Sequence, residues 1–135
     1  MKENRRALVI DDDPDIAEVL TTLLEVRGFE VDVVNDGIHA LEPKFDYDVV
    51  LLDLKMPVFD GERLSDYWLT TRPELLDKVI VLSGYSKFTR GRELPTFASV
   101  TKPFDFDLIS ELIDECARKP SERRTPVRIP NGQAN

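Results

Sequence analysis

The chain has 135 residues, which is the usual size of one domain. Its composition, 41% hydrophobic and 33% charged, is that of a globular protein in water, and no apolar run approaches the roughly 18 residues of a membrane span. Because the start, residues 1–6, is charged and the apolar run after it is short, no secretory signal peptide is expected. The one cysteine, Cys116, excludes an internal disulfide, so a reducing, cytoplasmic location is expected.

The formal net charge of −8 is divided unevenly along the chain. Residues 118–135 hold five Arg and Lys residues against one Glu, together with three prolines, so we expect a basic, disordered tail there, too short for an output domain. The acidic remainder argues against a nucleic-acid surface, which needs clustered basic residues. We expect one domain over residues 6–117, preceded by a short extension, residues 1–5.

Apolar patterns in the first part of the chain alternate between strand and helix. Residues 7–10 form a short apolar run that ends at an acidic cluster, as in a buried strand. Apolar residues then recur at helical spacing from Pro14, which suits a first helical turn, to Gly28, which suits the end of a helix. Residues 29–34 alternate like a strand, and residues 38–44 leave room for only a short helix because a proline stops it.

The second part of the chain continues this alternation. Residues 49–52 and 79–82 are continuous apolar runs, typical of strands buried on both faces. Between them, Gly61 opens a helical stretch, whereas residues 85–95 show little periodicity and predict a short or irregular helix at most. A fifth strand is predicted at residues 97–101. The last helix then has apolar residues at Leu108, Ile109, Leu112, Ile113 and Cys116.

Strands that alternate with helices predict an α/β fold, in which helices cover both faces of a five-stranded parallel sheet. Ligands of such sheets bind beyond the carboxyl ends of the strands. The unusual residues of this chain gather at those ends. Three aspartates, residues 11–13, follow the first strand, and Asp53, Ser83 and Lys102 follow the third, fourth and fifth.

The carboxylates of Asp11, Asp12 and Asp53 would meet at one edge if the first and third strands are neighbours. Carboxylates so close together repel one another, so a cation is needed to keep all of them ionised. Because the donors are hard oxygens, with no His or Cys near them in the sequence, Mg²⁺ or Mn²⁺ is favoured over zinc. Asp13, directly before Pro14, has the simpler role of a helix cap.

An aspartate at such an edge can also act as a nucleophile. A carboxylate that attacks phosphorus forms an acyl phosphate, and the oxygens around phosphorus then need positive charge and hydrogen-bond donors. Lys102 would supply a compact charge and Ser83 a hydroxyl. Each of these residues alone is more common in turns and loops, but their joint placement at one edge favours phosphoryl-transfer chemistry.

Four motifs, taken in order, resemble the receiver domains of two-component response regulators. The resemblance covers about residues 6–117 and implies a flavodoxin-like (βα)5 sandwich of three layers, with strand order 2-1-3-4-5. The motifs are Leu-Val-Ile-Asp-Asp-Asp-Pro at 8–14, the third strand continuing through Pro57 to Gly61 at 49–61, Val-Leu-Ser-Gly at 81–84, and Lys-Pro-Phe at 102–104.

The resemblance implies a role for each acidic residue at the strand ends. Asp53 resembles the phosphoacceptor. Asp12 resembles the direct ligand of Mg²⁺, and Asp11 the acid that reaches the metal largely through water. Asp53 and the backbone carbonyl of Lys55 would complete the protein's share of the metal ligands.

The remaining residues of the pattern act on the phosphoryl group or on its lifetime. Ser83 resembles the switch hydroxyl, and Lys102 resembles the lysine that contacts the phosphoryl group, with the peptide bond after it commonly cis in this family. Three residues would tune the reaction: Lys55 and Tyr85 lie where the family adjusts the lifetime of the acyl phosphate, and Gly84 lies where the family has a small residue beside the entry path of the phosphodonor. The structural residues of the pattern are Pro57, Gly61 and Pro103.

Two features depart from the usual pattern of this family. Receiver domains often carry an aromatic residue three positions before the lysine, and here that residue is Ser99. The interval between Ser83 and Lys102 is also short, which agrees with a short or irregular fourth helix. Residues 72–76 resemble the receiver modules of hybrid sensor kinases, so the chain is predicted to be a single-domain regulator or such a module.

The predicted function is a phosphorylation-dependent switch in a two-component phosphorelay. A histidine kinase or histidine phosphotransfer protein would donate a phosphoryl group to Asp53 in an Mg-dependent step, and the modified domain would change its affinity for an unknown downstream protein. Apart from this self-catalysed transfer and its own dephosphorylation, no enzyme activity is expected. Neither nucleic acid nor membrane is an expected partner, and a monomer is favoured over a dimer.

Two alternatives use the same residues differently. A phosphatase of the haloacid dehalogenase type also needs a strand-end aspartate and Mg²⁺, but it requires a second aspartate where Lys55 stands. A receiver-like interaction module that acts without phosphorylation usually lacks an acid or the lysine, although the absent switch aromatic agrees with it.

Three other residues have structural interpretations: His39 is solvated, Cys116 is buried, and Trp68 lies in the core or on a helix surface.

Overall fold

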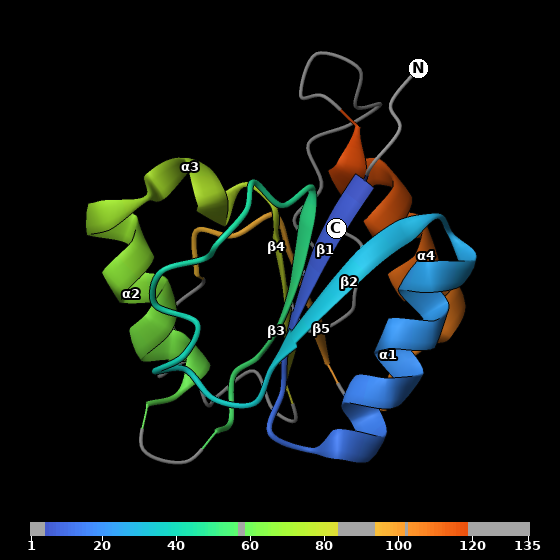
Figure 1. Ribbon diagram of the computed structural model, residues 1–135, viewed down its shortest axis with the longest axis horizontal. Helices are drawn as coiled ribbons and strands as arrows, with labels where there is room; N and C mark the ends of the chain where they lie inside the picture. The colour runs from blue at the N-terminus through green and yellow to red at the C-terminus, as the bar shows by residue number, and fades with distance from the viewer. Residues whose placement is uncertain (1–4, 57–58, 84–93, 102, 119–135) are drawn as a thin grey trace.

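The computed structural model describes residues 5–56, 59–83, 94–101 and 103–118. Within these ranges, five strands and four helices follow one another along the chain (Figure 1). They are β1 (Arg5–Ile10), α1 (Pro14–Val26), β2 (Phe29–Val34), β3 (Val49–Asp53), α2 (Gly61–Thr71), α3 (Pro73–Leu76), β4 (Val79–Ser83), β5 (Ala98–Thr101) and α4 (Phe106–Ala117).

The strands form one parallel sheet in the order β2-β1-β3-β4-β5, which confirms the predicted fold class. β3 lies at the centre, and all five of its residues are buried, as are the last four residues of β1. Burial on both faces explains why these strands are continuous apolar runs rather than alternating ones. Ile10 of β1 lies opposite Leu52 of β3, so Asp11, directly after β1, and Asp53, the last residue of β3, lie side by side.

Helices cover both faces of the sheet and form the outer layers (Figure 1). On one face, Leu51 belongs to a core cluster with Leu20 of α1 and Ile113 of α4. On the other face, Leu52 belongs to a second cluster with Trp68 of α2. Neighbouring residues of a strand point to opposite faces, so a single strand such as β3 supplies both clusters.

The helix α1 begins and ends as predicted. Asp13 is its N-cap, and one carboxylate oxygen accepts hydrogen bonds from the backbone N–H groups of Asp15 (2.9 Å) and Ile16 (3.4 Å). Pro14 occupies the first helical position. Gly28, just beyond the helix, has a φ of 93°, a conformation that residues with a side chain rarely adopt.

An ion pair links the two helices on the same face of the sheet. Arg27, directly after α1, donates from Nε to Oδ1 of Asp114 on α4 (3.0 Å), and a second bond joins Nη2 to Oδ2. The hydrogen bond with Arg27 lowers the pKa of the Asp114 carboxyl, although partial burial opposes this shift. The pair holds α1 and α4 side by side.

The short helix predicted at residues 38–44 is wrong. The backbone N–H of Ala40 donates to the carbonyl of Gly37 (3.1 Å), and the next N–H donates in the same way, so the segment forms tight turns. Pro43 has no N–H to continue a helical ladder, and its ring clashes with the preceding turn of a helix. The connection between β2 and β3 therefore has no helix among the described residues.

A short helix occurs elsewhere that is not among the predicted elements. It is α3, which begins at Pro73, a residue suited to a first helical position because its missing N–H is not needed there. The predicted fourth helix at residues 85–95 falls almost entirely outside the described residues. So do the predicted extension, apart from Arg5, and the predicted tail, apart from Arg118.

Polar contacts hold the end of the connection from β2 to β3 that lies directly before β3. Tyr47 is buried, and its Oη donates to Oδ2 of Asp32 on β2 (2.8 Å). Burial first, and then this hydrogen bond, raise the pKa of the Tyr47 phenol well above its usual value. The backbone N–H of Arg6 donates to Oδ2 of Asp48 (2.9 Å), directly before β3. These contacts fix the return of the chain into the sheet.

Three residues with structural interpretations lie as expected. Trp68 is fully buried in the core, Cys116 is also buried, and the side chain of His39 is exposed next to Asp36 (Nδ1 to Oδ1, 2.8 Å). Among the described residues, no helix combines the length and the apolar character needed to cross a membrane.

Candidate functional site

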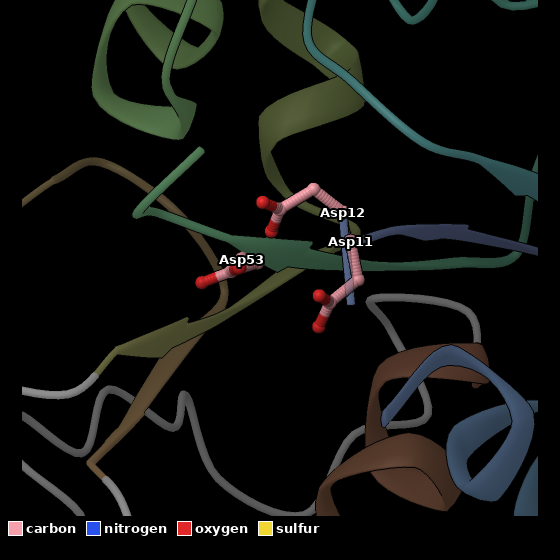
Figure 2. Close-up of side chains that lie close together, drawn as sticks. All are labelled: Asp11, Asp12 and Asp53. Carbon is pink, nitrogen blue, oxygen red and sulfur yellow. The ribbon is translucent and has the colours of Figure 1, made fainter. Parts of the chain in front are cut away.

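Three carboxylates gather beyond the carboxyl ends of β1 and β3. Asp11 and Asp12 follow β1, and Asp53 is the last residue of β3. One oxygen atom from each of the three lies within 4.8 Å of the others. Figure 2 shows the three side chains arranged around a common space at the edge of the sheet. The predicted neighbourhood of these residues is thus present in the structure.

The donor set of this cluster fits a hard divalent cation. Asp11 and Asp53 are only 3% and 5% exposed, whereas Asp12 is exposed toward solvent. Two nearly buried carboxylates this close together need a counter-charge, because burial and mutual repulsion both disfavour the ionised forms. The three ligand groups are carboxylate oxygens, which suit Mg²⁺ and not the softer metals that prefer sulfur and nitrogen.

Hydrogen bonds from nearby backbone N–H groups orient two of the carboxylates. Oδ1 of Asp11 accepts from the N–H of Asp13 (2.9 Å), and Oδ1 of Asp53 accepts from the N–H of Lys55 (3.1 Å). In both cases an aspartate accepts from the residue two positions further on, a local turn that this side chain favours. The pattern limits rotation of each carboxylate, so the cluster is organised by the chain around it.

The first turn of α2 approaches the residues directly after β3. The N–H of Gly61 donates to the carbonyl of Leu54 (2.9 Å), and a Cβ added to Gly61 would lie 2.6 Å from the carbonyl oxygen of Asp53. No residue with a side chain fits so close to the backbone. Asp60 caps this helix, because its Oδ1 accepts from the N–H of Arg63 (2.9 Å). The helix start therefore holds the chain after Asp53 in place.

Comparison with known proteins identifies the family of this fold. The family model of the response regulator receiver domain matches residues 7–114, which is most of the chain. The chain belongs to this family. Receiver domains act in two-component systems as phospho-signalling switches, and they are generally not enzymes in their own right.

Individual relatives agree with this assignment. The chain is 35% identical over 119 residues to a transcriptional regulatory protein CpxR homolog of Haemophilus influenzae, covering 79% of this chain and 48% of the relative. It is 36% identical over 114 residues to protein Rrf1 of Nitratidesulfovibrio vulgaris, covering 81% and 80%. The chain spans between about a quarter and about half the length of several of the curated relatives that it matches.

A solved structure extends the likeness to a protein with a bound metal. The response regulator protein TrrA of Thermotoga maritima, crystallised in complex with Mg(2+)-BeF, is 31% identical. The match has a TM-score of 0.73 and covers 83% of this chain and 98% of TrrA. Receiver domains interact with kinases or phosphotransfer proteins and with downstream effectors.

In this receiver domain, β3, β4 and β5 end one after another along the same edge of the sheet. Asp53 lies opposite Leu82, and Ser83 lies opposite Thr101. Asp53, Ser83 and Thr101 are therefore the last residues of three neighbouring strands along this edge. Lys102 itself lies outside the described residues, as do Pro57, Gly84 and Tyr85. The roles assigned to these residues and to Ser83 stay predictions.

Other predicted residues have described positions. The side chain of Lys55 is exposed, while Leu54 and Met56 on either side of it are buried. Ser99, at the position where receiver domains often carry an aromatic residue, lies opposite Val81 and is partly buried. The burial of Leu54 and Met56 fixes the backbone of Lys55 between them, close to the carboxylates.

One contact near the site is absent from the sequence-based prediction. Gly37, in the turn after β2, packs directly against Phe59, two residues before the start of α2. The pair Asp36-Gly37 after a strand does indicate a turn. Nothing in the local pattern indicates which distant residue that turn contacts.

Proposed function

We propose that this receiver domain is a phosphorylation-dependent switch in a two-component phosphorelay. Asp53 would accept a phosphoryl group from a histidine kinase or a histidine phosphotransfer protein. The observation that carries the proposal is the convergence of Asp11, Asp12 and Asp53, with their oxygens within 4.8 Å of one another at one edge of the sheet. The similarity to TrrA, which was crystallised in complex with Mg(2+)-BeF, supports it.

The metal proposed for the site is Mg²⁺, held by Asp11, Asp12, Asp53 and the backbone carbonyl of Lys55. When bound, Mg²⁺ would neutralise the carboxylates and the negative oxygens of the incoming phosphoryl group. Mg²⁺ is proposed in preference to Mn²⁺, because TrrA was crystallised in complex with Mg(2+)-BeF.

The transfer itself would be a displacement at phosphorus. A carboxylate oxygen of Asp53 attacks, the new O–P bond forms, and the bond from phosphorus to the donor imidazole breaks. The imidazole nitrogen keeps the electron pair and takes up a proton from water. The N–H of Lys55, which already donates to Oδ1 of Asp53, would hold the carboxylate in its orientation. Lys102 would contribute a compact positive charge to the phosphoryl oxygens.

Phosphorylation would then change the surface of the domain. The phosphoryl group adds negative charge and acceptor oxygens, to which Ser83 and Lys102 would respond. Because Ser99 replaces the usual switch aromatic, the coupling would depend on the loops after β3 and β4. The expected output is a changed affinity for a downstream protein.

Incubation with acetyl phosphate tests the proposed function by intact mass. We expect the native chain to gain the mass of one phosphoryl group in the presence of Mg²⁺, and to gain none when a chelator removes the metal. Asp53→Ala should gain none in either case. Asp46→Ala is the matched control, because Asp46 is an exposed aspartate before the opposite end of β3, and it should behave like the native chain.

If acetyl phosphate does not act as a donor, beryllofluoride binding tests the same site, with amide NMR as the readout. Absence of both the adduct and beryllofluoride binding would contradict the proposal. It would favour an interaction module that acts without phosphorylation.

A further inference from the structure

We propose that the turn after β2, residues 35–42, is a positioning element for the metal and phosphoacceptor site, and that Gly37 is the residue that makes this possible. We name these residues the support turn. The inference rests on the proposed function, because the property that the support turn controls is Mg²⁺ binding beside Asp53.

The first contact lies between the support turn and the start of α2. Gly37 is buried, and a Cβ added to it would lie 2.8 Å from Cδ2 of the Phe59 ring and closer still to the Phe59 carbonyl oxygen. A ring can rotate away, but a backbone oxygen moves only with its chain. A methyl group at residue 37 must therefore displace either the support turn or residues 59–61.

The support turn is held from behind, so it does not yield readily. Nε1 of Trp68 donates to the carbonyl of Leu41 (3.1 Å), and Oη of Tyr67 donates to Oε2 of Glu42 (2.6 Å). Trp68 is fully buried, and Ala40 is 1% exposed. Figure 1 shows the connection after β2 passing beside α2, which carries both anchoring side chains. Retreat of the turn would break these hydrogen bonds and open the core.

The displacement would therefore pass to the chain around Asp53. Phe59 is two residues before Gly61, and the N–H of Gly61 is bonded to the carbonyl of Leu54 (2.9 Å). Lys55, which directly follows Leu54, donates its N–H to Oδ1 of Asp53 (3.1 Å). Movement of residues 59–61 would shift both the carbonyl proposed as a metal ligand and the orientation of the Asp53 carboxylate.

A second connection reaches the other carboxylates. The N–H of Asp11 donates to the carbonyl of Val34, the last residue of β2, at 3.1 Å. Val34 directly precedes the support turn, so strain in the turn also bears on the backbone of Asp11. Both halves of the acidic cluster are thus connected to the same segment.

The test replaces Gly37 with Ala and measures Mg²⁺ binding by calorimetry with MgCl₂ on the full chain. We expect Gly37→Ala to weaken Mg²⁺ about tenfold, the lower end of the loss caused by removing outer support from a metal site. Gly28→Ala is the matched control. With a φ of 93° and no atom within 4 Å of the added Cβ, it strains the backbone without displacing a neighbour. It should lose stability in urea and keep the native Mg²⁺ affinity within about twofold.

The amide NMR spectrum gives a second readout that needs no metal. Gly37→Ala should shift the amides of Leu54 and Lys55, whereas Gly28→Ala should leave them unchanged. Phe59→Ala, which adds no atom, serves if Gly37→Ala does not fold. It should shift the same amides and weaken Mg²⁺ by a smaller factor.

The outcomes separate this inference from the function on which it rests. If the native chain binds no Mg²⁺, the proposed metal site fails, and the amide shifts still decide whether Gly37 positions the backbone beside Asp53. The inference is overturned if Gly37→Ala, or Phe59→Ala in its place, keeps native Mg²⁺ affinity and leaves the amides of Leu54 and Lys55 unmoved. Equal weakening by Gly28→Ala would also overturn it, because lost stability alone would then explain the effect.

Discussion

Asp12→Asn should weaken Mg²⁺ binding at least about 100-fold, more than is typical for loss of an outer partner of a metal ligand. Asp12 is the exposed member of a cluster whose oxygens lie within 4.8 Å of one another, and it is the residue that we propose as a direct ligand. An amide keeps the shape of the side chain but removes the charge that attracts a divalent cation. Titration with MgCl₂ in a calorimeter measures the loss, and phosphorylation by acetyl phosphate at low Mg²⁺ should slow with it.

The neighbouring residue provides a control with the same change of charge. Asp13 caps α1 by accepting from two backbone N–H groups, and asparagine caps helices about as well. Asp13→Asn should therefore keep Mg²⁺ affinity within about threefold. An exposed charge that does not contact the cation attracts it only weakly through water. Equal effects of the two substitutions would mean that only the overall charge of the edge matters, which would contradict the assignment of Asp12 as a ligand.

Trp68→Ala should lower the free energy of unfolding by about 3–5 kcal/mol, a large part of the 5–15 kcal/mol typical of a whole domain. The indole is fully buried against the sheet, and its Nε1 donates to the carbonyl of Leu41. Truncation leaves a cavity in the core and an unpaired carbonyl in the support turn. Urea unfolding followed by circular dichroism measures the change.

The next residue on α2 separates burial from helix propensity. Leu69 is 46% exposed, so Leu69→Ala should change the free energy of unfolding by less than about 1 kcal/mol. Trp68→Phe should fall between the two alanine variants, because it keeps most of the ring packing but loses the hydrogen bond to Leu41. A loss at Leu69 as large as that at Trp68 would show that this account of the core is incorrect.

The sheet and the acidic cluster follow from local patterns. A run of apolar residues such as Val49–Leu52 is long enough for a strand and too short for a helix, and its uniform apolar character requires cover on both faces. Parallel strands then bring their carboxyl ends to one edge. Local patterns thus place Asp11 and Asp53 at two strand ends of one edge, and the resemblance to receiver domains supplies the strand order that makes those ends neighbours.

The support turn could not be predicted in this way. Pro43 indicates that a helix there must be short, but it does not indicate that the segment forms turns instead. The Asp36 carboxylate accepts from the N–H of His39 (2.8 Å). This local hydrogen bond stabilises a single turn and not a continuing helix. The contact of Gly37 with Phe59 joins residues far apart in the chain, and neither residue carries a periodic signal.

The sequence does not predict the helix α3, for a related reason. It has four residues, which is too few for apolar spacing to show a helical period. Leu75 and Leu76 are both buried, as they would also be in an irregular segment. Pro73 is the one local signal for this helix, since proline favours the first position of a helix.

The measurement that tests the central claim most directly is the location of the phosphoryl group. Borohydride reduces an aspartyl phosphate to homoserine, so peptide sequencing by tandem mass spectrometry identifies the residue that was modified. We predict homoserine at residue 53 after incubation with acetyl phosphate and Mg²⁺, and none at Asp11, Asp12 or Asp48. Homoserine at one of those residues instead, or a phosphoryl adduct that borohydride leaves intact, would contradict the claim that Asp53 is the phosphoacceptor.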